Sequence, residues 1–159
     1  MNGEAHVSTA EAPSKARLRL WLRLLKASRA IEAELRDRMR REFNSTLPRF
    51  DVMAALERNE QGLKMSELSG VLKVSNGNVT GIVDRLAEDG LVARVAVTGD
   101  RRASRVCLTD RGRATFATQA AAHEGWVDEL FAQVPAGRAG EVAALIDGLT
   151  RPANREDER

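Results

Sequence analysis

The chain has 159 residues, of which 43% are hydrophobic and 30% charged, and this balance indicates one globular domain and excludes a disordered chain. Aromatic residues make up only 4%, which favours helices over a β-sandwich, because β-rich chains use more aromatic and β-branched residues. The formal net charge is only +2, so a nucleic-acid-binding surface must come from local clusters of basic residues.

The cysteine content and the apolar segments predict a cytoplasmic protein. Cys107 is the single cysteine, so no intrachain disulfide can form, and a reducing compartment is the natural one. Residues 1–15 contain no apolar stretch that could serve as a signal peptide. No run of apolar residues approaches the ~20 needed to span a bilayer, so we expect no membrane partner.

The N-terminal part predicts a flexible tail, residues 1–13, followed by a long helix that begins at Ser14 and reaches residue 45. Basic residues cluster between Lys15 and Arg29, where no acidic residue occurs. Extra leucines widen the apolar face of this helix beyond what one core requires. We therefore expect the helix to contact a second copy, with packing in the chain's own core as the alternative. The apolar residues are Leu18, Leu20, Trp21, Leu22, Leu24, Leu25, Ile31, Leu35 and Met39.

Two shorter helices are expected next. Thr46-Leu47-Pro48 predicts the start of the first one, because proline is tolerated in the first turn. Gly62 interrupts the pattern, and a further helix is expected over Met65–Leu72. Lys64 stands where a Ser or Thr would complete a capping box with Glu67, so that box is incomplete. The residues expected to face inward are Phe50, Met53, Ala54, Leu56, Leu68, Val71 and Leu72.

A third short helix follows after a tight turn, and two helices joined in this way are typical of a helix-turn-helix. Ser75 can cap it, and Gly90, which tolerates positive φ, can end it. The expected buried stripe consists of Ile82, Val83, Leu86 and Ala87. The opposite face carries small or amide-bearing groups that can approach base edges in a groove. These residues are Asn76, Gly77, Asn78, Thr80, Gly81, Asp84 and Arg85.

A β-hairpin wing is predicted after Gly90. Residues alternate over Leu91–Val97, a turn is expected over Thr98–Ser104, and a return strand over Arg105–Leu108. Arginines outnumber the acids Asp100 and Asp110 in this region, so it suits contacts with phosphate. The arginines are Arg94, Arg101, Arg102, Arg105, Arg111 and Arg113.

Two closing helices complete the predicted order. Thr109 can cap the first, Pro135 breaks it, and the second runs over Ala136–Leu149. Residues 151–159 are almost all charged and predict a flexible tail. The apolar residues of the two helices are Phe116, Ala120, Trp126, Val127, Leu130, Phe131, Val142, Leu145, Ile146 and Leu149.

The order of elements carries a family resemblance. The motif GLVAR at residues 90–94, Asp100-Arg101-Arg102 in the wing and LTDRG at residues 108–112 follow the recognition helix at matching spacings. With this order, residues 15–150 resemble the MarR family of bacterial transcription regulators. The resemblance implies a mainly α fold with a small β-wing, in which a winged helix-turn-helix lobe (46–109) lies between dimerisation helices (14–45 and 110–150).

The resemblance also implies a docking geometry. Members of the family are homodimers with interdigitating terminal helices, recognition helices in successive major grooves and wing arginines in flanking minor grooves. This places Ser75, Asn76, Asn78 and Thr80 at the major groove. Arg102 then lies in a minor groove, where the strongly negative potential favours arginine. Asp100 would orient a wing arginine through a charge-assisted hydrogen bond.

Several of these residues have a simpler alternative role. Asn76 and Asn78 can read adenine or can merely cap the helix. Arg85 can reach a phosphate or pair with Glu88. Arg94 and Arg105 can bind phosphate or pair with Asp100, and Arg102 can lie solvated at the hairpin tip. The predicted DNA-binding set is Ser75, Asn76, Gly77, Asn78, Thr80, Arg85, Arg94, Asp100, Arg101, Arg102 and Arg105.

The sequence predicts no metal site, no cofactor and no catalysis. His123-Glu124 lacks a second histidine four residues on, where Val127 stands, so a zinc-helix motif is incomplete. His6 lies in the N-terminal tail. Cys107 is expected to point outward from a wing strand, but no second cysteine is present to resolve a sulfenic acid, so a redox role is disfavoured.

An effector site is expected on the first helix. The basic run there motivates a hypothesis that an aromatic carboxylate or its CoA thioester binds near Trp21, with Arg19 and Arg23 countering its charge. The sequence then predicts a homodimeric, sequence-specific repressor of aromatic compound catabolism, released from a pseudo-palindromic operator by that inducer. A regulator that has no small-molecule ligand and competes with other DNA-bound proteins is the alternative. A small enzyme or ligand carrier is a third possibility.

Overall fold

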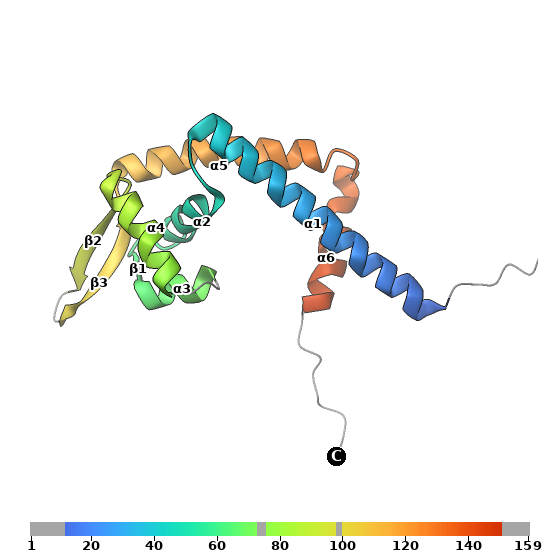
Figure 1. Ribbon diagram of the computed structural model, residues 1–159, viewed down its shortest axis with the longest axis horizontal. Helices are drawn as coiled ribbons and strands as arrows, with labels where there is room; N and C mark the ends of the chain where they lie inside the picture. Colours follow the sequence, from blue (N-terminus) through green and yellow to red (C-terminus); the bar gives the residue numbers. More distant parts are fainter. Residues whose placement is uncertain (1–11, 73–75, 98–99, 151–159) are drawn as a thin grey trace, which may run out of the picture. The chain divides into compact units, whose positions relative to one another are not determined.

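The computed structural model describes residues 12–72, 76–97 and 100–150, with all side chains in these ranges except those of Asn76 and residues 100–103. These ranges hold six helices and three strands, and the mainly α fold with a small sheet is confirmed (Figure 1). The elements are α1 (Pro13–Phe43), α2 (Leu47–Glu57), β1 (Leu63–Lys64), α3 (Met65–Leu72), α4 (Asn76–Glu88), β2 (Val92–Val97), β3 (Asp100–Leu108), α5 (Asp110–Leu130) and α6 (Ala136–Thr150).

The chain divides into two compact units, Met1–His123 and Glu124–Arg159, and the boundary falls inside α5. The expected DNA-binding lobe, residues 46–109, lies wholly within the first unit. In Figure 1, α2, α3 and α4 gather beside the β2–β3 hairpin. The hydrophobic core of this lobe lies between these three helices and the sheet.

The core confirms most of the expected apolar positions and corrects three. Val71 was expected to face inward but is 54% exposed, and Ala87 is also exposed, whereas Val79 is fully buried. The stripe of α4 is therefore shifted by about one turn toward the N-terminus. A pattern of only four apolar residues does not fix the rotation of a helix to within one turn. The fully buried core residues include Val52, Met53, Leu56, Leu68, Val79, Val83, Leu86 and Val106.

The helices of the lobe begin and end at recognisable caps. The Thr46 hydroxyl accepts a hydrogen bond from the Arg49 backbone N–H at the start of α2, and the Thr109 hydroxyl accepts one from Gly112 at the start of α5. Glu67 accepts the backbone N–H of Lys64 at 2.8 Å, so half of the capping box forms although the Ser or Thr is missing.

The small sheet contains a strand that the sequence did not predict. β1 is only two residues long and pairs with β3, which gives the antiparallel order β1-β3-β2. The return strand begins at Asp100 and not at Arg105, so the expected turn over residues 98–104 was too long. An irregularity between Ala96 and Val97 shifts the register of β2, and such a shift hides a strand from simple alternation.

Cys107 is covered more than expected. Its neighbours Val106 and Leu108 face the core as predicted, yet Cys107 itself is half-buried. Gly62, with φ of +75°, brings the backbone against it, because a Cβ at Gly62 would overlap the Cys107 sulfur. The thiol is therefore partly shielded from solvent.

The helix α1 begins at Pro13, one residue before the expected Ser14, and its C-terminal half packs on the lobe through Leu35 and Met39. On α2, Phe50 stacks against Phe116 and His123 of α5, with ring centroids 5.4 and 4.8 Å apart. The N-terminal half of α1 leaves large apolar side chains exposed by more than half. They are Leu18, Leu20, Trp21 and Leu22.

In the second unit, Trp126 is buried, whereas no residue of α6 is. The apolar side chains on α6 include Leu145, exposed by 74%, and Leu149, exposed by 67%. Phe131, just beyond the end of α5, is also exposed. Among the described residues, every helix is too short or too polar to cross a membrane.

Gly112 offers a test of how α5 is anchored to the lobe. A Cβ at this position would overlap the carbonyl oxygen of Leu91 and lie 3.2 Å from Leu108 Cδ2. We expect Gly112→Ala to lower the free energy of unfolding by roughly 3 kcal/mol, because backbone atoms cannot move aside. Gly70→Ala is the control, since a Cβ there meets open space, and it should raise stability by about 1 kcal/mol. Urea denaturation measures both, and equal effects would contradict the close packing.

Candidate nucleic-acid interface

The helix α4 presents one open face. Val79, Val83 and Leu86 are fully buried and fix the rotation of the helix about its axis. A Cβ on Gly77 or Gly81 would meet no atom within 4 Å, so the backbone of α4 is bare along this face. The described residues exposed around these glycines are Asn78, Thr80, Asp84 and Arg85. A helix of this kind can approach a groove closely.

Part of the predicted DNA-binding set lies outside the described residues. Ser75 is outside them entirely, and so are the side chains of Asn76, Asp100, Arg101 and Arg102. The backbone of the last three belongs to β3, and Asp100 pairs with Val97 at the end of the β2–β3 hairpin. The contact expected for Arg102 in a minor groove therefore stays a prediction.

Arg94 and Arg105 both have intramolecular partners, whereas the side chain of Asp100, their alternative expected partner, lies outside the described residues. Arg94, on β2, donates to the Asp84 carboxylate of α4 at 2.7 Å. Arg105, on β3, donates to the carbonyl oxygen of Gly62 at 2.8 Å and lies 3.7 Å from the Glu67 carboxylate. Arg94 thus ties the wing to α4, and Arg105 ties β3 to the segment that enters α3.

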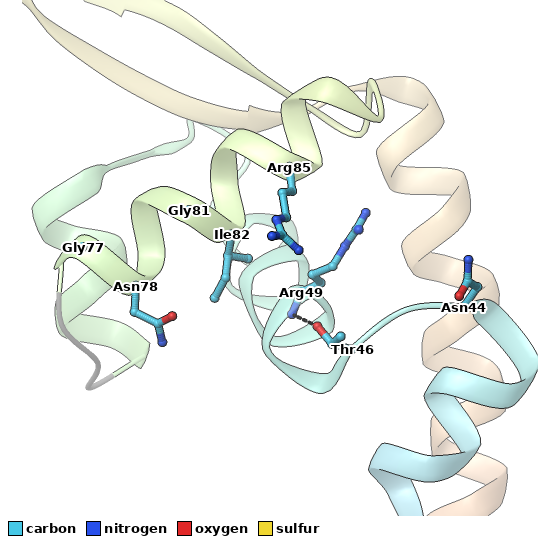
Figure 2. Close-up of a pocket in the computed structure, with 8 residues that line it drawn as sticks. All are labelled: Asn44, Thr46, Arg49, Gly77, Asn78, Gly81, Ile82 and Arg85. Atoms are coloured by element: carbon cyan, nitrogen blue, oxygen red, sulfur yellow. Dashed lines mark hydrogen bonds between the residues drawn. The ribbon is translucent and has the colours of Figure 1, made fainter.

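A cleft of about 460 Å³ lies between α2 and α4 (Figure 2). Figure 2 shows Arg85 reaching from α4 toward α2, and Arg49 extending from α2 into the same gap. Arg49 forms an ion pair with Asp89, which follows the last residue of α4. The lining residues are Asn44, Thr46, Arg49, Gly77, Asn78, Gly81, Ile82 and Arg85.

Sequence reasoning missed Arg49 and Asp89. They are separated by 40 residues, and no local spacing marks them as partners. The signal that was available is the pairing of an arginine in the first turn of α2 with an acid beside the terminating Gly90, two positions that a helix-turn-helix brings near each other. Arg85, in contrast, was expected to reach a phosphate or Glu88, and the structure places it beside Arg49 at the cleft.

A second cavity of about 310 Å³ adjoins the first and shares Thr46, Asn78 and Ile82 with it. Arg36 and Arg40, from the C-terminal part of α1, complete it together with Ser45 and Pro48. Cationic side chains of α1 and polar groups of α4 therefore surround one connected region of the lobe.

The residues expected to bind an effector do not line either of these cavities. Arg19, Trp21 and Arg23 lie on the exposed half of α1. Residues four apart share a face of a helix and residues two apart do not, so Arg19 and Arg23 lie together and Trp21 lies on another face. A ligand held between Arg19 and Arg23 therefore does not lie on the face of α1 that carries Trp21.

Two carboxyl groups outside the exposed face of α4 have shifted pKa values. A hydrogen bond from Arg38 lowers the pKa of Glu34 on α1. Loss of hydration raises the pKa of Asp51 on α2, against an opposing effect of His123. Glu34 lies on α1 and Asp51 on α2, so neither group lies on α4 itself.

Comparison with known proteins identifies relatives along most of the chain. The sequence profile described as "MarR family" matches residues 45–104. The transcriptional activatory protein BadR of Rhodopseudomonas palustris is 32% identical over 116 residues, which cover 67% of this chain and 61% of BadR. The chain spans between 47% and 61% of the length of the curated relatives that it matches first.

Two solved structures extend this likeness. A MarR family transcriptional regulator from Silicibacter pomeroyi is 35% identical, with a TM-score of 0.71, over 88% of this chain and 96% of that regulator. Sco3205 of Streptomyces coelicolor, a MarR family regulator solved in complex with DNA, has a TM-score of 0.72 at 19% identity, over 94% and 96% of the two chains. At that identity the second likeness is one of fold, whereas the first is one of family. None of these names describes an enzyme.

Proposed function

The chain belongs to the MarR family, and we propose that it works as a homodimer that binds operator DNA and regulates transcription. The observation that carries this proposal is the bare, open face of α4, held by a fully buried stripe on the opposite side. The existence of a DNA complex for Sco3205, a protein of the same fold, supports it.

In the proposed complex, α4 enters the major groove and the β2–β3 wing lies along the flanking minor groove. Asn78 and Thr80 reach base edges from α4, together with Ser75 and Asn76. Gly77 and Gly81 let the backbone come close to the bases. Arg102 enters that minor groove beside Arg101, and Asp100 orients one of the two arginines.

The exposed apolar side chains of α1 and α6 support a dimer. Leu18 and Trp21 of α1, and Leu145 and Leu149 of α6, are each exposed by more than half, and several large apolar side chains exposed on one helix usually mark a protein interface. A second copy would cover these side chains, so residues 14–45 and 110–150 serve as dimerisation segments. The dimer then reads two half-sites of a pseudo-palindrome about 10 bp apart.

We propose repression relieved by an aromatic carboxylate or its CoA thioester, bound where Arg19 and Arg23 of one chain meet Trp21 of the other. Such a ligand acts by binding more tightly to the dimer in which the two α4 helices have a spacing that does not fit DNA. The shift in population toward that state is set by the difference in the ligand's affinity for the two states. The alternative is a regulator that has no such ligand and competes with other DNA-bound proteins. Among the relatives, BadR is named an activatory protein and MdtR a repressor.

Substitutions in α4 and in the wing should have different effects on DNA binding. Asn78→Ala should change base preference, because it removes a donor and acceptor for base edges. Arg102→Ala should weaken binding to all sequences and make the dependence on salt shallower. Gel shifts with the DNA upstream of the protein's own gene, repeated with scrambled duplexes, measure both effects. Wild-type affinity and preference in both variants would refute the docking.

The dimer can be tested with one charged substitution on α6. Leu145→Glu should raise the concentration needed for dimerisation by at least tenfold, because it buries a charge in the interface. Ala144→Glu is the control, since it adds the same charge on the opposite face of the helix. Sedimentation velocity over a range of concentrations measures the effect. A wild-type chain that stays monomeric would exclude the proposed dimer.

The effector site can be tested by fluorescence, because the chain has only two tryptophans, Trp21 and Trp126. Benzoate-like acids and their CoA thioesters should quench the tryptophan fluorescence of the wild type. They should not quench that of Trp21→Phe, which retains Trp126 as a reporter. Arg19→Gln and Arg23→Gln should weaken that response, since each removes a counter-charge. The absence of any response across a panel of such compounds would favour the alternative without a ligand.

A further inference from the structure

We propose that the cleft between α2 and α4 holds one phosphate of the DNA backbone between Arg49 and Arg85, and that Asp89 is the positioning residue that holds Arg49 in place. The proposal rests on the proposed function, because the phosphate belongs to the duplex that α4 reads. The proposal adds α2 to the DNA interface and gives Asp89 the role of positioning Arg49.

The geometry of Arg49 carries the first step. The Arg49 side chain is 21% exposed, and its Nε is buried. This Nε finds no hydrogen-bond acceptor in the described part of the chain. Buried donors in proteins nearly always have a partner, so an unpaired one marks a place where an acceptor is missing. The fork of a guanidinium presents several donors in one plane, a shape that matches phosphate oxygens.

The surroundings of the cleft carry the second step. Arg85 and Arg49 enter it from α4 and α2, so an oxyanion between them would contact two cations (Figure 2). Gly77 and Gly81 line the same cleft and belong to the bare face of α4. An anion here therefore lies beside the surface that faces the groove, where the phosphates that border the groove run.

Asp89 supplies the third step. Its carboxylate is half exposed and forms an ion pair with Arg49. Exposed ion pairs contribute little to stability, so the pair matters mainly for orientation. An acid near DNA repels phosphate, and the position of Asp89 beside the interface is explained if it directs Arg49 into the cleft.

The first experiment measures binding of the full chain to a duplex of arbitrary sequence between 50 and 250 mM salt. Arg49→Gln and Arg85→Gln should each weaken binding roughly tenfold and reduce the slope of log affinity against log salt by about 1, as the loss of one phosphate contact does. Arg58→Gln, at the other end of α2, is the matched control and should leave the slope unchanged. Arg49→Lys keeps the charge but loses the fork, and should recover the slope but not the full affinity.

The second experiment substitutes acidic residues. Asp89 can act by repelling DNA or by positioning Arg49, and these two explanations predict opposite changes in DNA affinity. Asp89→Asn removes a negative charge and would strengthen DNA binding if Asp89 acted only by repulsion. We expect it to weaken binding severalfold, because Arg49 loses its anchor. Glu88→Gln, the neighbouring exposed acid, is the control and should strengthen binding slightly.

The outcomes separate the inference from the proposed function. A wild type that ignores duplex DNA at 50 mM salt refutes both. A wild type that binds, with Arg49→Gln behaving like Arg58→Gln or Asp89→Asn behaving like Glu88→Gln, overturns the inference alone. Calorimetry with benzoate and inorganic phosphate tests a small-anion site. Saturable binding that Arg49→Gln abolishes, with an unchanged DNA salt slope, would assign the cleft to a small anion and overturn the proposal.

Discussion

The burial of one narrow stripe on α4 is the constraint from which the interface follows. Val79, Val83 and Leu86 have no exposed surface, and they pack against the apolar residues of α2, α3 and the sheet. A helix held by a single stripe can rotate only at the cost of exposing that stripe, since each buried aliphatic side chain contributes about 1.5–3 kcal/mol. The rotation of α4 is thereby fixed, and the same rotation turns Gly77, Asn78 and Gly81 outward. Packing on the buried side of α4 thus decides which residues are exposed on the opposite side.

Ion pairs complete the arrangement without contributing much to stability. Asp84 pairs with Arg94 of β2, and Asp89 pairs with Arg49 of α2, so α4 and the residue that follows it are tied to two different neighbours. All four side chains are at least one-fifth exposed, and pairs of this kind typically contribute less than about 1 kcal/mol each. Each pair neutralises the charge of one acid and holds one arginine in a single orientation. Asp84 and Asp89 are thus each paired with an arginine of a neighbouring element.

The sequence predicted the order of helices, the wing and the caps, because each depends on neighbours within a few residues. Thr46, Thr109 and Gly90 act where the local pattern put them. Leu63–Lys64 was missed as a strand because two residues carry no alternation, and β1 exists only through its pairing with β3. The pair of Arg49 and Asp89 was missed for a related reason, since its members meet only after three helices have packed. Predictions failed where the partner of a residue lies far away in the chain.

The connection between α1 and α2 gives the fold a route by which a change in α1 reaches α4. Only residues 44–46 join the two helices, and Asn44 takes a left-handed conformation with φ of 48°. Asn44 and Thr46 line the cleft that Arg49 and Arg85 share, and Arg36 and Arg40 of α1 line the adjoining cavity. A shift of α1 therefore moves the walls of both cavities, because so short a connection cannot absorb it. A ligand that prefers one position of α1 therefore favours one geometry beside α4. If DNA requires another geometry, each of the two weakens the binding of the other by the same factor.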